Sequence, residues 1–257
     1  YADLAIETIA EAVENGFSDV KTMKSHKSLA ALRDRDDFQM LLKELQAKEL
    51  AAQEVDTDDQ KLANRRKSVN LLRELAGNGS AGSRHRKTLA ATLHSVGEIQ
   101  IGLRNYDEAR ASLKEALQTS QAILDEQPDD PQASLNVLAV EYSQGRLHMA
   151  QERYPEVHRH AQGCLEKLLR IAQNHRENQD LQWEISILER KIYQLYGRCG
   201  LFPLVRDHAA RSVKFHRVWS TAEIPELETE GRFSTIVLLE TDKELARGYL
   251  SQPIESV

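Results

Sequence analysis

A repeat with a step of 48 residues runs through the second half of this chain and limits the folds it can adopt. Tyr106, Tyr154 and Phe202 are separated by this step, and the same interval relates small or apolar residues on both sides of them. Those positions are Leu89, Val137 and Ile185; Ile99, Leu147 and Leu195; Ala109, Val157 and Val205; Leu113, Ala161 and Ala209; and Leu117, Leu165 and Val213. A fixed period of this length indicates one supersecondary unit used three times.

Each copy is expected to form two long antiparallel helices. In the first copy, apolar residues at helical spacing predict a helix that Asn105 interrupts, and a second helix runs from Tyr106 to Leu124. The apolar positions of the first helix are Leu89, Leu93, Val96, Ile99 and Leu103. In the second copy Glu141 and Gln144 occur at the positions of Leu93 and Val96, so its first helix is expected to rotate toward Leu138 and Tyr142.

Composition agrees with an all-α chain and argues against several functions. Straight-chain helix formers dominate, and only 5% of the residues are aromatic. The net charge of -6 lacks the surplus of Lys and Arg that nucleic-acid binding needs. We find no signal peptide, no apolar run near the ~20 residues that span a bilayer, and only two cysteines, so we expect a cytoplasmic protein without membrane insertion. Since the chain opens on Tyr1, we expect it to be an excised fragment.

The N-terminal third follows a different pattern and ends in a glycine-rich stretch. Helices are expected over residues 2–14, 36–54 and 60–76, within an N-terminal segment 1–76. Residues 77–85 are predicted to be a flexible linker. Its glycines (Gly77, Gly79 and Gly82) spell the G-x-G-x-x-G pattern, but a nucleotide loop needs a preceding strand, and here a helix is expected. The three helix pairs then occupy residues 86–219, and a capping helix and tail follow over 220–257.

The first copy resembles a tetratricopeptide repeat. The resemblance rests on a small residue in the first helix, an aromatic residue after the turn and an alanine late in the second helix, namely Gly97, Tyr106 and Ala116. It implies a right-handed α-solenoid of stacked antiparallel helix pairs, with elongated repeats because the usual period is about 34 residues. The third copy departs from the family, since Tyr193 stands where the glycine is expected.

A second resemblance lies near the N-terminus. Residues 12–42 are similar to the segment that closes tetratricopeptide arrays in bacterial, eukaryotic-type serine/threonine protein kinases, through Ala12-Val13, Gly16-Phe17, Leu29, Leu32-Arg33-Asp34, Asp37-Phe38 and Leu41-Leu42. In those proteins the kinase domain precedes the array, which implies that this chain comes from the C-terminal part of a kinase. The chain itself has neither the His-Arg-Asp nor the Asp-Phe-Gly motif of a kinase domain.

Three charged or metal-like groups of residues favour structural roles. His158, His160 and Cys164 give too few ligands at suitable spacing for zinc, and Cys164 is expected to be a packed thiol. The basic runs at 65–67 and 84–87 are expected on a solvated face, with docking on the parent's kinase domain as the alternative. We therefore expect no metal and no cofactor.

The expected binding surface follows from the tetratricopeptide resemblance, in which the first helices line a concave groove. The residues opposite the core stripe of those helices are His94, Glu98 and Ile101, then Tyr142, Arg146 and Met149, and then Arg190, Gln194 and Arg198. The arginines favour an acidic peptide or protein partner, or a C-terminal carboxylate. The expected function is non-catalytic protein–protein interaction in a kinase scaffold region. The alternative is the effector-sensing array of a bacterial transcription or signalling regulator.

Overall fold

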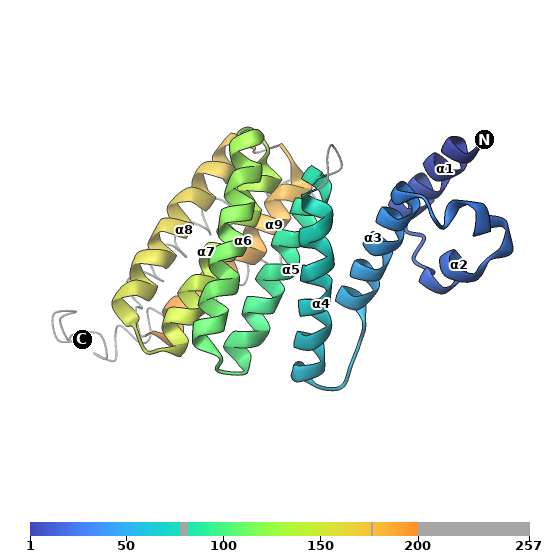
Figure 1. Cartoon of the computed structure of the whole chain (residues 1–257). Coiled ribbons are helices and arrows are strands. Elements are labelled where there is room, and N and C mark those ends of the chain that lie inside the picture. The colour runs from blue at the N-terminus through green and yellow to red at the C-terminus, as the bar shows by residue number, and fades with distance from the viewer. Residues whose placement is uncertain (78–81, 176, 200–257) are drawn as a thin grey trace, which may run out of the picture. The chain divides into compact units, whose positions relative to one another are not determined.

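The computed structural model describes residues 1–77, 82–175 and 177–199, and all regular elements within these ranges are helices (Figure 1). The predicted all-α class is confirmed. Long helices pack against their neighbours in the chain: α3 on α4, α4 on α5, α7 on α8 and α8 on α9. The chain forms two compact units, residues 1–123 and residues 124–257, and each is described by itself. The predictions for Phe202, Val205, Ala209, Val213 and the segment 220–257 lie outside the described residues.

The first unit begins with helices around a small apolar core. The elements are α1 (Ala2–Glu14), α2 (Val20–Ser25), the 3-10 helix η1 (Lys27–Leu32) and α3 (Asp36–Ala52). As predicted, α1 ends at Asn15, and Gly16 follows with a φ of +99°, a left-handed conformation that glycine adopts without strain. Val13 and Phe38 belong to the core, but Leu4 is 63% exposed. Ile6, two residues later on α1, is buried in this core.

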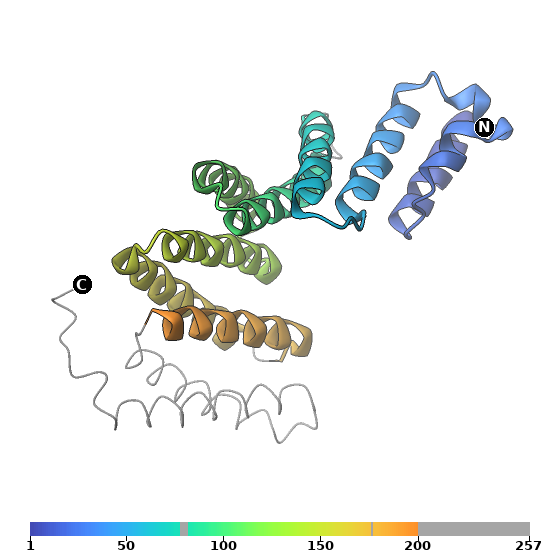
Figure 2. The ribbon, with the colours of Figure 1, turned by 90° about the horizontal axis from the view of Figure 1, so that it is seen from below.

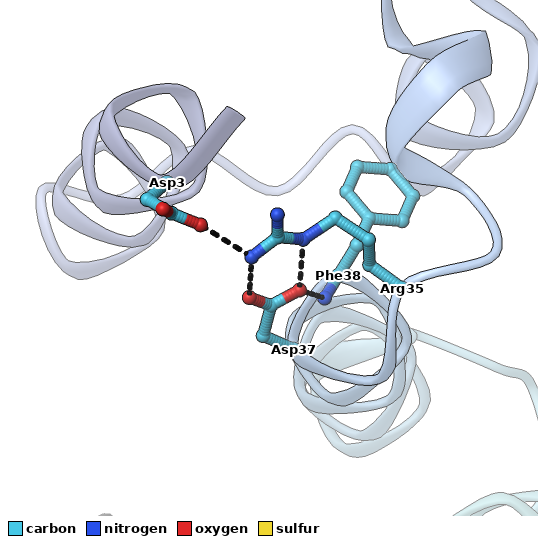
Figure 3. Close-up of polar contacts among 4 residues, drawn as sticks. All are labelled: Asp3, Arg35, Asp37 and Phe38. Atoms are coloured by element: carbon cyan, nitrogen blue, oxygen red, sulfur yellow. Dashed lines mark hydrogen bonds and ion pairs between the residues drawn. The ribbon is translucent and has the colours of Figure 1, made fainter. Parts of the chain in front are cut away.

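An arginine fork connects the starts of α1 and α3 (Figure 3). Arg35 donates from Nε and Nη2 to the carboxylate of Asp37 at 3.0 and 2.7 Å, and Nη2 also donates to Asp3 at 2.7 Å. Asp37 in turn accepts from the backbone N–H of Phe38 at 2.8 Å, at the first turn of α3. Because these groups are accessible to water, the ion pairs contribute little to the free energy of unfolding. Their main effect is to orient the two helix ends.

The rest of the first unit is built from α4 (Asp58–Ala76), α5 (Gly82–Gly102) and most of α6 (Tyr106–Glu126). Thr57 caps α4 by accepting from the N–H of Gln60 at 3.2 Å. Residues 78–81 of the predicted linker lie outside the described ranges, but residues 82–85 were wrongly assigned to it, since α5 begins at Gly82.

Two parallel ion pairs join α4 to α6. Arg66 contacts Glu108 and Arg73 contacts Glu115, each with a nitrogen–oxygen distance of 2.6 Å. Both partners advance by seven residues, about two helical turns, so the same contact is made twice along the helices. The predicted basic run at 65–67 therefore contributes Arg66 to an internal contact and not only to a solvated face.

A buried carboxylate gathers three basic side chains within the first unit. Glu44 of α3 has a side chain only 4% exposed; its Oε2 lies 2.6 Å from Nη2 of Arg84 and 3.1 Å from Nε2 of His85. Its Oε1 lies 2.9 Å from Nζ of Lys48. Burial alone would raise the pKa of Glu44, but the hydrogen bonds from Lys48 and His85 and the nearby charges outweigh it and lower this pKa. The sequence suggested a solvated face for Arg84 and His85, whereas the fold uses them to hold α5 against α3.

The close approach of α5 and α6 depends on Gly97. A Cβ placed on Gly97 would lie 2.6 and 2.7 Å from Cδ2 and Cγ of Leu113, so no larger residue fits without a shift. Leu93 and Leu113 are buried as predicted, at 2% and 0% exposure, whereas Leu117 is only half-buried. Ile101, expected on the binding groove, is buried at 7% exposure, and that assignment was wrong.

The second unit contains α7 (Pro131–Ala150), α8 (Tyr154–Asn174) and α9 (Gln179–Arg198), seen together in Figure 2. Leu165 of α8 and Ile192 of α9 are buried in its core. The expected rotation of α7 toward Leu138 is confirmed, since Leu138 is 1% exposed and Tyr142 packs against the same core. Tyr193, which replaces the expected glycine, is itself buried and donates to the carboxylate of Glu189 at 2.5 Å.

The turns after α5 and α7 have the same backbone geometry. Arg104 has a φ of 62°, and the next N–H, that of Asn105, donates to the carbonyl of Gln100 at 2.8 Å. In the second unit Glu152 has a φ of 59°, and the next N–H donates to the carbonyl of His148 at 2.9 Å. Positive φ is uncommon for residues other than glycine. The two positions differ by 48 residues, the step of the sequence pattern.

Substitution of Gly97 tests the helix contact. Gly97→Ala should lower the free energy of unfolding by about 1–3 kcal/mol, because the added methyl group overlaps Leu113 in a packed interior. Gly102→Ala in the same helix is the control: a Cβ there meets nothing within 4 Å, so the change should be neutral or slightly stabilising. Urea unfolding followed by circular dichroism measures both. Equal stability of the two variants would contradict the close contact.

The buried carboxylate predicts a stability effect that depends on pH. Glu44→Gln should destabilise the chain by about 1–3 kcal/mol at neutral pH, because it leaves buried donors without their charged acceptor. Since the pKa of Glu44 is lowered by folding, its contribution is present above the ordinary value of 4.5 and is lost as the pH falls through the lowered value. The difference from the native chain should therefore shrink in acid. Glu74→Gln, which removes the exposed pair with Lys43, should cost under about 1 kcal/mol.

Candidate functional site

Two contacts place the C-terminal halves of α7 and α9 side by side in the second unit. A Cβ on Gly145 of α7 would lie 3.2 Å from Cδ2 of Leu195 on α9, and the sulfur of Met149 lies 3.5 Å from that of Cys199. Both contacts join residues 50 positions apart, so the two helices run in the same direction with a constant offset. This alignment decides which of the predicted binding residues come together.

Tyr142, Arg146 and Arg198 meet at this junction. Tyr142 and Arg146 are half-buried and lie one turn apart on α7, whereas Arg198 is exposed at the end of α9. Burial lowers the pKa of the Arg146 guanidinium, and the positive charge of Arg198 lowers it further. Burial raises the pKa of the Tyr142 hydroxyl, and Arg198 partly offsets that effect. The positive charge of Arg198 thus acts on both Tyr142 and Arg146.

The exposed side of α9 extends this cationic region toward the middle of the helix. Gln194 and Arg198 are exposed as expected for binding residues, and Lys191, which the sequence analysis did not single out, is exposed at the same helical spacing. Arg190 is only half-buried, and its Nε is enclosed. Lys191 could have been predicted as a binding residue from its spacing, because positions 191, 194 and 198 fall on one face of a helix.

The remaining predicted residues belong to the first unit. His94 and Glu98 lie one turn apart on α5, and both are half-buried with interactions inside the protein. Tyr142, Arg146 and Arg198 all belong to the second unit, whereas His94 and Glu98 do not. We call these three residues the α7–α9 cationic site.

Histidines and cysteines of the second unit lie at contacts between its helices. The rings of His148 and His160 lie with centroids 5.0 Å apart, and Cys164 is buried at 1% exposure with its sulfur 3.9 Å from Glu141. Within residues 1–77, 82–175 and 177–199, no three His, Cys, Asp or Glu side chains form a group suited to a metal ion. Burial and the nearby carboxylate of Glu141 raise the pKa of Cys164 to about 12.

Two surface clefts lie elsewhere. One, of about 480 Å³, occurs in the first unit between α2, α3 and α4, with Lys24 and Lys67 at its edges and Leu50 and Leu71 in its wall. The other, of about 330 Å³, occurs in the second unit between the start of α7 and the end of α8 and includes Asp129. Both are open and polar in part, so neither is the closed apolar pocket that a small effector would favour.

No protein-family model matches the chain, and no curated protein matches its sequence. In the part of the chain that the structure describes, no helix combines the length and the apolar character needed to cross a membrane.

The raised pKa of Cys164 predicts an unreactive thiol. At about pH 8, Cys164 should be alkylated by iodoacetamide far more slowly than Cys199, because thiolate is the reacting species and Cys164 is both buried and protonated. Mass spectrometry of timed samples measures the two rates. In denaturant the two thiols should react at similar rates, and fast native labelling of Cys164 would show that α8 opens.

Proposed function

We propose that this chain is a non-catalytic protein-interaction segment whose second unit binds an acidic peptide or a C-terminal carboxylate at the α7–α9 cationic site. The observation that carries the proposal is the juxtaposition of Arg146 and Arg198 across two packed helices, beside the hydroxyl of Tyr142. Two guanidinium groups on adjacent packed helices favour a negatively charged group of the partner. Carboxylates meet this need, and arginine binds them in a bidentate geometry.

Stacked repeats provide the proposed framework for binding. The equal turns at Arg104 and Glu152, at the 48-residue step, support repeated helix pairs of the tetratricopeptide kind, arranged as a right-handed solenoid. In such an arrangement the first helices of each pair form the binding surface, and within the second unit these are α7 and α9.

The parent protein is proposed to be a bacterial serine/threonine protein kinase, cytoplasmic in this part. The support is the resemblance of residues 12–42 to the closing segment of arrays in such kinases. The turn at Gly16 and the buried Phe38 give that segment a defined fold here. The coding sequence before Tyr1 decides the matter: a Gly-rich loop, a His-Arg-Asp motif and an Asp-Phe-Gly motif are expected there, and their absence would rule the proposal out.

A double substitution tests the binding proposal. Arg190→Ala with Arg198→Ala should abolish selection of acidic peptides from a random library with free C-termini, because it removes two guanidinium groups from α9. The melting temperature should stay within about 2–4 °C of the native value, the shift that ~1 kcal/mol produces in a domain of this size. Peptide selection by the full chain and thermal melts are the measurements.

A second double variant provides the matched control. Arg159→Ala with Arg170→Ala removes the same charge from exposed positions on α8 and should leave the selected peptides unchanged. Unaltered selection by the α9 variant would place the binding site elsewhere. A large drop in its melting temperature would assign Arg190 a structural role, and the single Arg198→Ala variant would then carry the binding test.

A further inference from the structure

The cleft of about 480 Å³ in the first unit is lined by three helices. Its lining residues are Val20 and Lys24 of α2, Gln46, Glu49 and Leu50 of α3, and Lys67, Asn70 and Leu71 of α4. We call this set the α2–α4 cleft. α3 packs against both α2 and α4 and lies between them (Figure 1), so α2 and α4 supply opposite edges of the cleft.

Polar contacts join α3 to α4 on either side of this cleft. Nζ of Lys43 lies 2.8 Å from Oε2 of Glu74, and Nδ2 of Asn64 donates to Oε1 of Gln53 at 2.9 Å. The cleft residues of both helices fall between these two contacts and lie on the same helix faces. Among the described residues, no hydrogen bond or ion pair joins the cleft residues of α3 to those of α4, so the row of contacts is interrupted at the cleft.

The base of the α2–α4 cleft is packed and apolar. Oγ of Ser68 donates to the carbonyl of Ala47 at 2.8 Å, and both residues are buried, so α3 and α4 are in direct contact at the level of the cleft. Leu50 and Leu71 line the cleft and are only half-buried, so part of their apolar surface is accessible to a partner. Covering that surface would favour binding.

Two lysines bring positive charge to opposite edges of the cleft. Lys24 of α2 and Lys67 of α4 are exposed, and within the described part of the chain their side chains take part in no hydrogen bond or ion pair. Glu49 of α3 is the one carboxylate among the lining residues, so two lysines against one glutamate leave the lining with a net positive charge. This arrangement is complementary to a partner that carries acidic residues near both edges.

We infer that the α2–α4 cleft binds an amphipathic helix of a protein partner, whose apolar stripe covers Leu50 and Leu71 and whose flanking acidic residues reach the two lysines. Amphipathic helices bind in apolar grooves through residues at i, i+3, i+4 and i+7. An extended segment would instead bind along an exposed strand edge, whereas all the lining residues belong to helices. The inference goes beyond the proposed function, since it involves no residue of the α7–α9 cationic site.

Three synthetic peptides of about 18 residues, long enough to form a helix, test the inference on the full chain. The first has a leucine stripe flanked by glutamates, the second has glutamines in place of the glutamates, and the third keeps the glutamates but has a central proline that breaks the helix. NMR titrations give the dissociation constants, and the first peptide should shift the backbone amide signals of Leu50 and Leu71. At about 0.15 M salt it should bind about fivefold to tenfold more tightly than the second peptide, the gain from two exposed ion pairs. The third peptide should bind more weakly than the first, because it cannot present the whole stripe on one face.

Variants of the cleft separate the effect of its charge from that of its shape. Lys24→Gln with Lys67→Gln should remove the preference for glutamate over glutamine. Lys27→Gln with Lys114→Gln removes the same charge from exposed positions outside the lining and should retain the preference. Asn70→Trp should weaken binding of both helical peptides, because the larger side chain occupies the cleft. Since Asn70 is exposed, this variant should keep the native melting temperature.

Several outcomes would overturn the inference. Equal affinity for the first and second peptides would reject the role of the lysines, and equal affinity for the first and third would reject a helical occupant. Binding of neither helical peptide would reject the inference as a whole. If sedimentation shows that the chain alone dimerises and that Asn70→Trp abolishes the dimer, the occupant is a second copy of the chain and not a partner helix.

One further outcome separates this inference from the proposed function. Peptide binding that survives Asn70→Trp but is lost in Arg198→Ala would place the helix at the α7–α9 cationic site, which would overturn the inference and leave the proposed function in place. Library peptides shorter than about 12 residues seldom form helices in water, so their selection tests the α7–α9 cationic site without involving this cleft.

Discussion

Burial shared between neighbouring helices is the constraint on which the rest of this structure depends. α7 illustrates it most clearly, because its buried residues are spread around the helix and include Leu135, Val137, Leu138 and Val140. A helix with so little polar surface cannot exist alone in water, and its stability comes from packing on more than one side. In the second unit α8 and α9 both contact α7. The three helices therefore stabilise one another as a group, and no two of them form an independent pair.

Close packing of this kind requires small residues at defined positions, and the sequence contains them. Gly97 lies against Leu113 in the first unit, and Gly145 lies against Leu195 in the second, again 48 residues further along the chain. The contacts differ, however: Gly97 accommodates the following helix, whereas Gly145 accommodates the helix after that. The same small residue thus serves contacts with different neighbours, as stacking of pairs on pairs requires.

The sequence predicted the long helices and their ends well because periodicity and turn residues act locally. The ends of α1 and the starts of α6 and α8 followed from Asn15-Gly16, Tyr106 and Tyr154. The sequence failed where distant contacts decide. Leu4 fits an apolar stripe but lies off the face that Ile6 and Val13 bury. Residues 82–85 have the local composition of a linker. Their contact with Glu44, which lies 41 residues before His85, cannot be recognised from the neighbouring sequence.

The short elements between α1 and α3 were missed for a related reason. α2 has only six residues, too few for a periodic pattern, and it is held by Asp19 at its start and by the buried Met23. Of the predicted binding residues, Tyr142, Arg146 and Arg198 are brought together, whereas Ile101 is enclosed by the core. The apolar pattern of one helix predicts on which face of that helix a residue lies, but it does not predict which neighbouring helix covers that face.

Arginines of the two units take part in different kinds of helix packing. Arg66, Arg73 and Arg84 each contact a carboxylate on another helix at 2.6 Å, so their charges serve the fold. On α7, burial and the positive charge of Arg198 both lower the pKa of the Arg146 guanidinium. Folding brings these two charges together because Gly145 and Met149 demand that α7 and α9 pack closely. The same close packing that stabilises the second unit therefore also determines where Arg146 and Arg198 lie along the two helices.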